Sequence, residues 1–170
     1  VFERIGETLA SLMAKVEDGR SPEVGEAIGP PEDVRVLPPV LPTKVVCIGL
    51  NYVHHAEEMD KEVPEEPMMF LKPSTAVVGQ KATIELPEQS NEVHHEAELA
   101  VVLGRTARRI DQADIDRYVL GYTCANDVTA RDIQRREQRY TRSKGFDTFC
   151  PVGPAIATAD DFDPSDHQIS

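Results

Sequence analysis

Two glutamates two residues apart lead directly into an apolar run. Glu96-Ala97-Glu98 is followed by Leu99-Ala100-Val101-Val102-Leu103-Gly104. In a β-strand, successive side chains alternate between the two faces, so Glu96 and Glu98 would point the same way. Two like charges on one face of a core-bound strand repel each other and resist desolvation. A divalent cation between them removes both costs, so the spacing predicts a metal site, with an exposed edge strand as the alternative.

A third carboxylate, Asp127, comes just after the apolar stretch 120–125, where a strand is expected to end. Three carboxylates without a cysteine partner suit Mg²⁺, Mn²⁺ or Ca²⁺ better than Zn²⁺. His94 and His95 precede the glutamates and keep a transition-metal alternative open, that of a zinc hydrolase. We interpret both histidines as surface residues that flank a strand.

Residues 51–58 combine histidines and glutamates at helical spacing. In a helical turn, His55 and Glu58 are three residues apart and face each other. A carboxylate beside an imidazole raises its basicity and fixes its tautomer, which is how a general base is made. His54 with Glu57 would make the same pair one position earlier, so the spacing does not choose between the two pairs. The alternative to a catalytic pair is an exposed polar helix.

Basic side chains follow Asp127 in the chain. Arg131 and Lys144 near a metal could hold a substrate carboxylate or stabilise an oxyanion. The arginines between them are interpreted mostly as a solvated patch: Arg135, Arg136, Arg139 and Arg142.

The elements that must position these side chains are mainly short strands, with few helices and frequent Pro and Gly. This pattern predicts a mainly β fold with peripheral helices, of the α+β class. We expect strands over 45–50, 68–71, 77–79, 83–86, 95–103, 120–126 and 149–157, with 77–79 and 83–86 as a β pair. Helices are expected over 3–17, 52–59, 111–118 and 129–136. Residues 1–43 are interpreted as an N-terminal helix with a Pro- and Gly-rich lead-in, and residues 44–170 as the main domain.

The bulk properties exclude some classes of protein. The formal net charge of −12 disfavours a nucleic-acid partner, because phosphate binding needs a basic surface. No apolar run approaches the ~20 residues of a membrane span, so no membrane partner is expected. Three widely spaced cysteines predict reduced thiols and a cytoplasmic location. The chain lacks an initiator Met, which is consistent with a start inside a longer protein.

In order along residues 45–156, these motifs resemble the fumarylacetoacetate hydrolase (FAH) family. Each piece is short, but the ordered set is highly specific. The motifs are Ile48-Gly49-Leu50-Asn51-Tyr52 with His55 and Glu58, Phe70-Leu71-Lys72-Pro73-Ser74, Glu96-Ala97-Glu98-Leu99, Gly121-Tyr122, 126–134 (Asn-Asp-Val-Thr-Ala-Arg-Asp-Ile-Gln), and 144–154 from Lys144 to Pro154.

The resemblance implies a mixed β-sandwich roll, usually dimeric, so a homodimer is expected. It implies that a divalent cation, Mg²⁺ or Mn²⁺, is held by Glu96, Glu98 and Asp127. It also selects His55 with Glu58 as the dyad that activates water or moves a proton. Lys144 is expected to act in catalysis, and the implied substrate-binding residues are Arg131, Gln134 and Lys72.

The expected function is a metal-dependent hydrolase that cleaves a C–C bond in an acylpyruvate or fumarylpyruvate-like 2,4-diketo acid. The alternatives are an isomerase or decarboxylase of aromatic catabolism, similar to 2-hydroxyhepta-2,4-diene-1,7-dioate isomerase, or an oxaloacetate decarboxylase. A catalytically inactive metal-binding or scaffold protein is a further alternative. Because family sequences continue past residue 170 with a pocket-lining Gly-Thr-Pro segment, we expect this domain to be incomplete at its C-terminus.

Overall fold

The central feature is a mixed sheet of four strands in the order β5-β10-β8-β7. The computed structural model describes residues 2–3, 18–19, 27–30, 35–58, 60–167 and 169. β7 (Ala97–Leu103) pairs antiparallel with β8 (Val119–Asn126), and β8 pairs antiparallel with β10 (Cys150–Thr158). β5 (Val77–Val78) joins the other edge of β10 in parallel. The expected mainly β, α+β architecture is confirmed.

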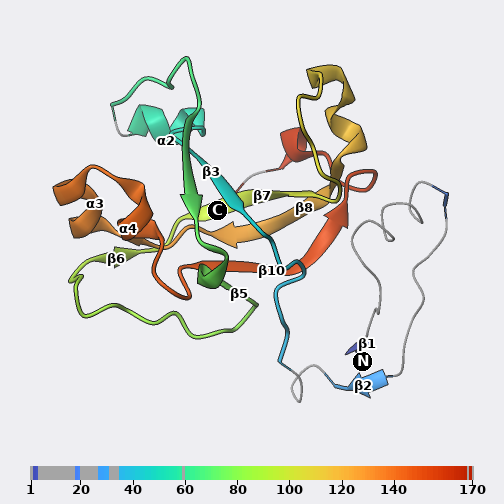
Figure 1. Ribbon diagram of the computed structural model, residues 1–170, viewed down its shortest axis with the longest axis horizontal. Coiled ribbons are helices and arrows are strands. Elements are labelled where there is room, and N and C mark those ends of the chain that lie inside the picture. The colour runs from blue at the N-terminus through green and yellow to red at the C-terminus, as the bar shows by residue number, and fades with distance from the viewer. Residues whose placement is uncertain are drawn as a thin grey trace.

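Three further strand pairs accompany this sheet. β3 (Val45–Gly49) and β4 (Met68–Lys72) form an antiparallel pair. Val45 packs against buried side chains of the main sheet, so β3 and β4 lie on one of its faces (Figure 1). β6 (Val93–His94) pairs with β9 (Thr129–Ala130), and β1 (Phe2–Glu3) pairs with β2 (Ala27–Gly29).

The described helices are short and lie outside the sheet. They are α2 (Val53–Glu58), α3 (Arg131–Glu137) and α4 (Tyr140–Lys144), with 3-10 turns at Ser74–Ala76, Gln112–Arg117 and Pro164–Asp166. α3 ends where Gln138 takes a left-handed conformation with φ of 52°, and α4 packs back beside α3 (Figure 1). No helix in the described ranges is both long and apolar enough to cross a bilayer.

A small apolar core lies under the segment that links β8 to α3. Val128, Ala130, Ile133 and Phe149 are almost fully buried and touch one another. Phe146 packs on Phe149 with ring centroids 5.2 Å apart. This cluster supports the backbone on both sides of Asp127 and Arg131, and therefore holds the site in place.

Several local expectations differ from the structure. β5 does not pair with 83–86, which is not a strand; β5 pairs instead with β10, some 70 residues later, and Glu85 N–H donates to Thr148 Oγ1 at 2.8 Å. The helix expected over 111–118 is a 3-10 turn. Helix α4 was not expected from the sequence, whereas the four arginines interpreted as a solvated patch are indeed exposed. The helix expected over 3–17 lies outside the described residues, apart from Glu3 in β1.

Candidate metal centre and its cavity

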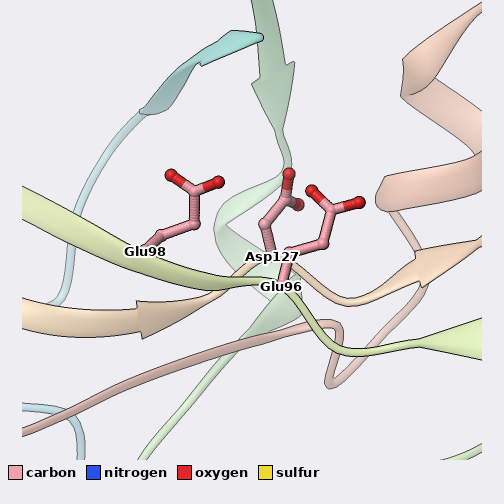
Figure 2. Close-up of side chains that lie close together, drawn as sticks. All are labelled: Glu96, Glu98 and Asp127. Atoms are coloured by element: carbon pink, nitrogen blue, oxygen red, sulfur yellow. The ribbon is translucent and has the colours of Figure 1, made fainter. Parts of the chain in front are cut away.

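The three carboxylates predicted as metal ligands come together at the end of the β7–β8 ladder. Ligand oxygens of Glu96, Glu98 and Asp127 all lie within 4.8 Å of one another. Figure 2 shows the three side chains rising on the same side of the backbone. The antiparallel pairing places the start of β7 beside the end of β8, and Asp127 N–H donates to the Glu96 carbonyl at 2.9 Å.

Glu96 does not lie within the strand, contrary to the expectation. β7 begins at Ala97, so Glu96 lies just before the strand and only Glu98 lies within it. Glu96 is held instead by its own N–H, which donates to Asn126 Oδ1 at 3.0 Å. The two glutamates converge because this bond anchors Glu96 to the end of β8.

Buried cationic groups surround two of the carboxylates. Lys144 Nζ lies 2.5 Å from Asp127 Oδ2, 3.0 Å from Glu96 Oε2 and 2.8 Å from Thr129 Oγ1. Lys72, only 2 % exposed, donates to Asp127 Oδ1 and to the Val128 carbonyl. The contacts of Lys144 with Asp127, Glu96 and Thr129 use all three of its ammonium protons, so this buried charge has a full set of hydrogen-bond acceptors.

Arg131 is the second cationic side chain, after Lys144, that contacts Glu96. Its guanidinium donates to Glu96 Oε1, and its Nη1 donates to Gln134 Oε1 at 2.7 Å. Arg131 and Gln134 are three residues apart on α3, so the first turn of that helix holds both toward the carboxylates.

Glu98 differs from its neighbours in charge balance. Burial raises the pKa of Glu96, but Lys144 and Arg131 outweigh it and leave that pKa below its ordinary value. For Glu98, burial and then the charges of Asp127 and Glu96 raise the pKa to about 7. Among the described residues no ion pair to Glu98 is found. A divalent cation among the three carboxylates would supply the missing positive charge, so the residues present fit a hard metal.

The carboxylates open into a cavity of about 300 Å³. Phe70 and Tyr140 form an apolar part of its wall, with ring centroids 5.1 Å apart, and the Lys144 ammonium lies 5.2 Å from the centre of the Phe70 ring. The polar part of the lining includes Glu96, Glu98, Asp127, Arg131, Gln134 and Lys144. The arrangement suits a small anion that has both a carboxylate and a polarisable oxygen.

Asn51 and Tyr52 line this cavity, and helix α2 begins at the next residue, Val53. His54 Nδ1 lies 3.6 Å from Glu57 Oε2, with side chains 97 % and 69 % exposed, so this histidine–glutamate pair lies in solvent. The side chains of His55 and Glu58 fall outside the part of the chain that the structure describes. The choice of His55 over His54 therefore continues to depend on the family resemblance.

The positions of Lys72 and His94 bear on the roles expected for them, substrate binding for Lys72 and zinc binding for His94. Lys72 does not line the cavity that the described residues form; it lies behind Asp127. His94 lies 3.5 Å from Glu92, and no potential metal-binding group among the described residues includes His94 or His95. The zinc alternative therefore gains no support.

Two residues of the site had no role assigned from sequence. Thr129, fully buried, accepts from Lys144 and lies 3.1 Å from Glu96 Oε1. Tyr52 accepts a hydrogen bond from Leu99 N–H at 3.0 Å, directly after Glu98. Only weak features of the sequence pointed to these two residues. Thr129 follows Asp127 by two residues, and Tyr52 belongs to the motif that precedes His55.

Comparison with known proteins identifies the family that this domain matches. Residues 44–170 match the family described as Fumarylacetoacetate (FAA) hydrolase C-terminal. The rat protein Oxaloacetate tautomerase Fahd2a, mitochondrial, is 42 % identical over 172 residues, which covers 99 % of this chain and 53 % of the relative.

This chain is also similar to solved structures of two isomerases. 5-carboxymethyl-2-hydroxymuconate delta-isomerase from Mycobacterium smegmatis superposes with a TM-score of 0.73 at 48 % identity, covering 86 % of this chain and 57 % of that one. 2-hydroxyhepta-2,4-diene-1,7-dioate isomerase from Mycobacterium marinum gives 0.72 at 46 % identity, covering 85 % and 53 %. The chain spans about half the length of several relatives that it matches. The predicted resemblance is confirmed: this chain belongs to the fumarylacetoacetate hydrolase family.

Proposed function

We propose that this chain carries the metal centre of an isomerase or tautomerase that moves a proton within a 2-oxo dicarboxylic acid. The observation that carries the proposal is the cluster of Glu96, Glu98 and Asp127, facing a cavity that Lys144 and Arg131 also line. The similarity to a tautomerase and to two isomerases favours this reaction over the C–C hydrolase expected first.

The family is generally dependent on a divalent metal, and the all-oxygen cluster suits Mg²⁺ or Mn²⁺, with Ca²⁺ as a further candidate. Glu96, Glu98 and Asp127 would hold the cation. When bound, it would supply Lewis acidity that stabilises negative charge on the 2-oxo oxygen of the substrate. Lys72, behind Asp127, would fix that carboxylate rather than contact the substrate.

The remaining residues would bind the substrate and move its proton. Arg131, aligned by Gln134, offers a planar donor pair that matches a carboxylate, and Lys144 adds a positive charge at the same end. His55 with Glu58 would take a proton from carbon 3 of the substrate, and a proton returned to the 2-oxo oxygen completes the keto–enol exchange. The exchange conserves all atoms and electrons and needs no co-reactant.

A substrate panel tests the reaction. Purified protein is incubated with Mg²⁺ or with EDTA, and the keto–enol exchange of oxaloacetate is followed by ultraviolet absorbance. We expect Mg²⁺-dependent exchange that is lost in Glu98→Gln. Release of pyruvate from an acylpyruvate without exchange would establish the hydrolase instead, and CO₂ release from oxaloacetate would establish the decarboxylase.

The assembly and the location also stay predictions. Exposed apolar side chains on β3 and β4, at Val46, Met69 and Leu71, would suit a homodimer contact. Light scattering of the purified protein measures this directly, and a monomer at all concentrations would reject it. The cytoplasmic location rests on the cysteine content, whereas the rat relative is named as mitochondrial.

A further inference from the structure

Tyr52 connects two parts of the site that are far apart in the sequence, the start of α2 and strand β7. β7 is an edge strand of the main sheet as described, so one side of it has no strand partner. The Tyr52 hydroxyl accepts a hydrogen bond from Leu99 N–H of this strand at 3.0 Å. The half-buried tyrosine therefore binds the strand at the residue next to Glu98.

Tyr52 and Glu98 also line the same cavity, and the Tyr52 hydroxyl is bound to the residue that directly follows Glu98. A phenol has one proton to donate and lone pairs to accept. Because Leu99 N–H occupies an acceptor position, the phenolic proton is free for Glu98. This matters because Glu96 and Asp127 are aligned by lysine and arginine, whereas Glu98 has no such ion pair among the described residues.

Tyr52 also belongs to the start of α2. Its carbonyl accepts from Ala56 N–H at 3.0 Å, within the first turn of the helix. Ala56 is 1 % exposed, so this turn is packed against the body of the protein. The helix that carries His55 and Glu58 is thus tied, through a single residue, to the strand that carries Glu98.

We propose that Tyr52 is a positioning residue that orients the Glu98 carboxylate for a divalent cation and fixes α2 relative to the metal centre. The inference rests on the proposed metal centre. Hydrogen-bond partners of metal ligands generally change metal affinity by ~10–100-fold when they are removed, because the ligand loses its fixed orientation.

The first test is Mn²⁺ binding by isothermal titration calorimetry of wild type and Tyr52→Phe. We expect about 10-fold weaker binding in the variant, at the lower end of the usual range. Tyr122→Phe is the matched control: Tyr122 is also half-buried, but it packs against Phe162 and lies outside the cavity lining. The control should bind Mn²⁺ like wild type.

A double-mutant cycle shows whether Tyr52 acts through Glu98. In a Glu98→Ala background, followed by the electron paramagnetic resonance signal of free Mn²⁺ up to millimolar concentrations, Tyr52→Phe should cause less than about a twofold further change. A loss of the same size in both backgrounds, or wild-type affinity in Tyr52→Phe, would overturn the inference. Absence of Mn²⁺ binding by wild type would instead reject the metal centre itself.

Discussion

Lys144 Nζ lies 2.5 Å from Asp127 Oδ2, and both side chains are at least nine-tenths buried. The same ammonium is 3.0 Å from Glu96 Oε2, so Lys144 bridges two of the three carboxylates. This lysine therefore places a positive charge between Glu96 and Asp127. Lys144 also lines the cavity, so its positive charge lies beside any anion that enters it.

The Lys144→Met variant tests this bridge. Breaking a buried ion pair costs about 3–5 kcal/mol, and Lys72 and Arg131 still neutralise part of the charge, so we expect a loss of about 3 kcal/mol in metal-free unfolding free energy. Urea denaturation in EDTA measures it. Arg142→Met, which removes an exposed pair with Glu137, should be nearly neutral. Equal stability of wild type and Lys144→Met would contradict the bridging role.

Glu98→Gln should remove a metal ligand while it preserves side-chain shape. Loss of a ligand's hydrogen-bond partner alone costs ~10–100-fold in metal affinity, so loss of the ligand charge should cost more than about 100-fold. Mn²⁺ titration calorimetry gives the constant, and a melting curve verifies the fold. Undiminished Mn²⁺ binding would exclude Glu98 from the site.

Glu98 should also make the metal-free protein less stable as pH rises. Burial, followed by Asp127 and Glu96, raises its folded-state pKa from 4.5 to about 7. The folded protein therefore keeps a proton that the unfolded chain releases, and this contribution is complete below about pH 4.5 and lost by about pH 7. Urea unfolding in EDTA across this range should show the decline.

The matching control is Glu98→Gln, in which this part of the pH dependence should disappear. The lowered pKa of Glu96 acts in the opposite direction at lower pH, since its stabilisation is lost as that carboxylate protonates. The difference between wild type and Glu98→Gln separates the two effects. Parallel pH profiles would show that Glu98 does not titrate as described.

His55→Ala should separate proton transfer from metal binding. A general base contributes about 10²–10⁴-fold to rate, so we expect turnover to fall by at least about 100-fold with Mn²⁺ affinity unchanged. His54→Ala is the control, because His54 is 97 % exposed beside Glu57, and it should keep full turnover. Reduced metal affinity in His55→Ala would make His55 a ligand, and full turnover would remove it from the mechanism.

Ile133 should be critical for the scaffold under the site. It is fully buried against Val128, Ala130 and Phe149, so Ile133→Ala should cost about 2–5 kcal/mol and Ile133→Val about 0.5–1.5 kcal/mol. Urea denaturation gives both values. Ile115, which is partly exposed, serves as the comparison. If Ile115→Ala lowered the free energy of unfolding as much as Ile133→Ala, the cluster around Ile133 would not be more important for stability than a surface site.

Local sequence patterns predicted most of the strands and the chemistry of the site. Apolar runs such as 99–103 and 120–125 specify strands because side-chain alternation and burial act over neighbouring residues. Three carboxylates without a cysteine partner indicated a hard cation from ligand chemistry alone. The family motifs added the order of the residues and their roles.

The tertiary structure decided the contacts between distant segments. β5 pairs with β10 rather than with residues 83–86, and Lys72 lies behind Asp127 across 55 residues of sequence. It also placed His54 in solvent and, among the described residues, paired Glu96 and Asp127 but not Glu98 with cationic side chains. The sequence by itself determined which groups could bind a metal, because ligand type and strand period are local properties. Only the packed chain decided which charges are compensated, because burial and distance depend on every segment that surrounds the site.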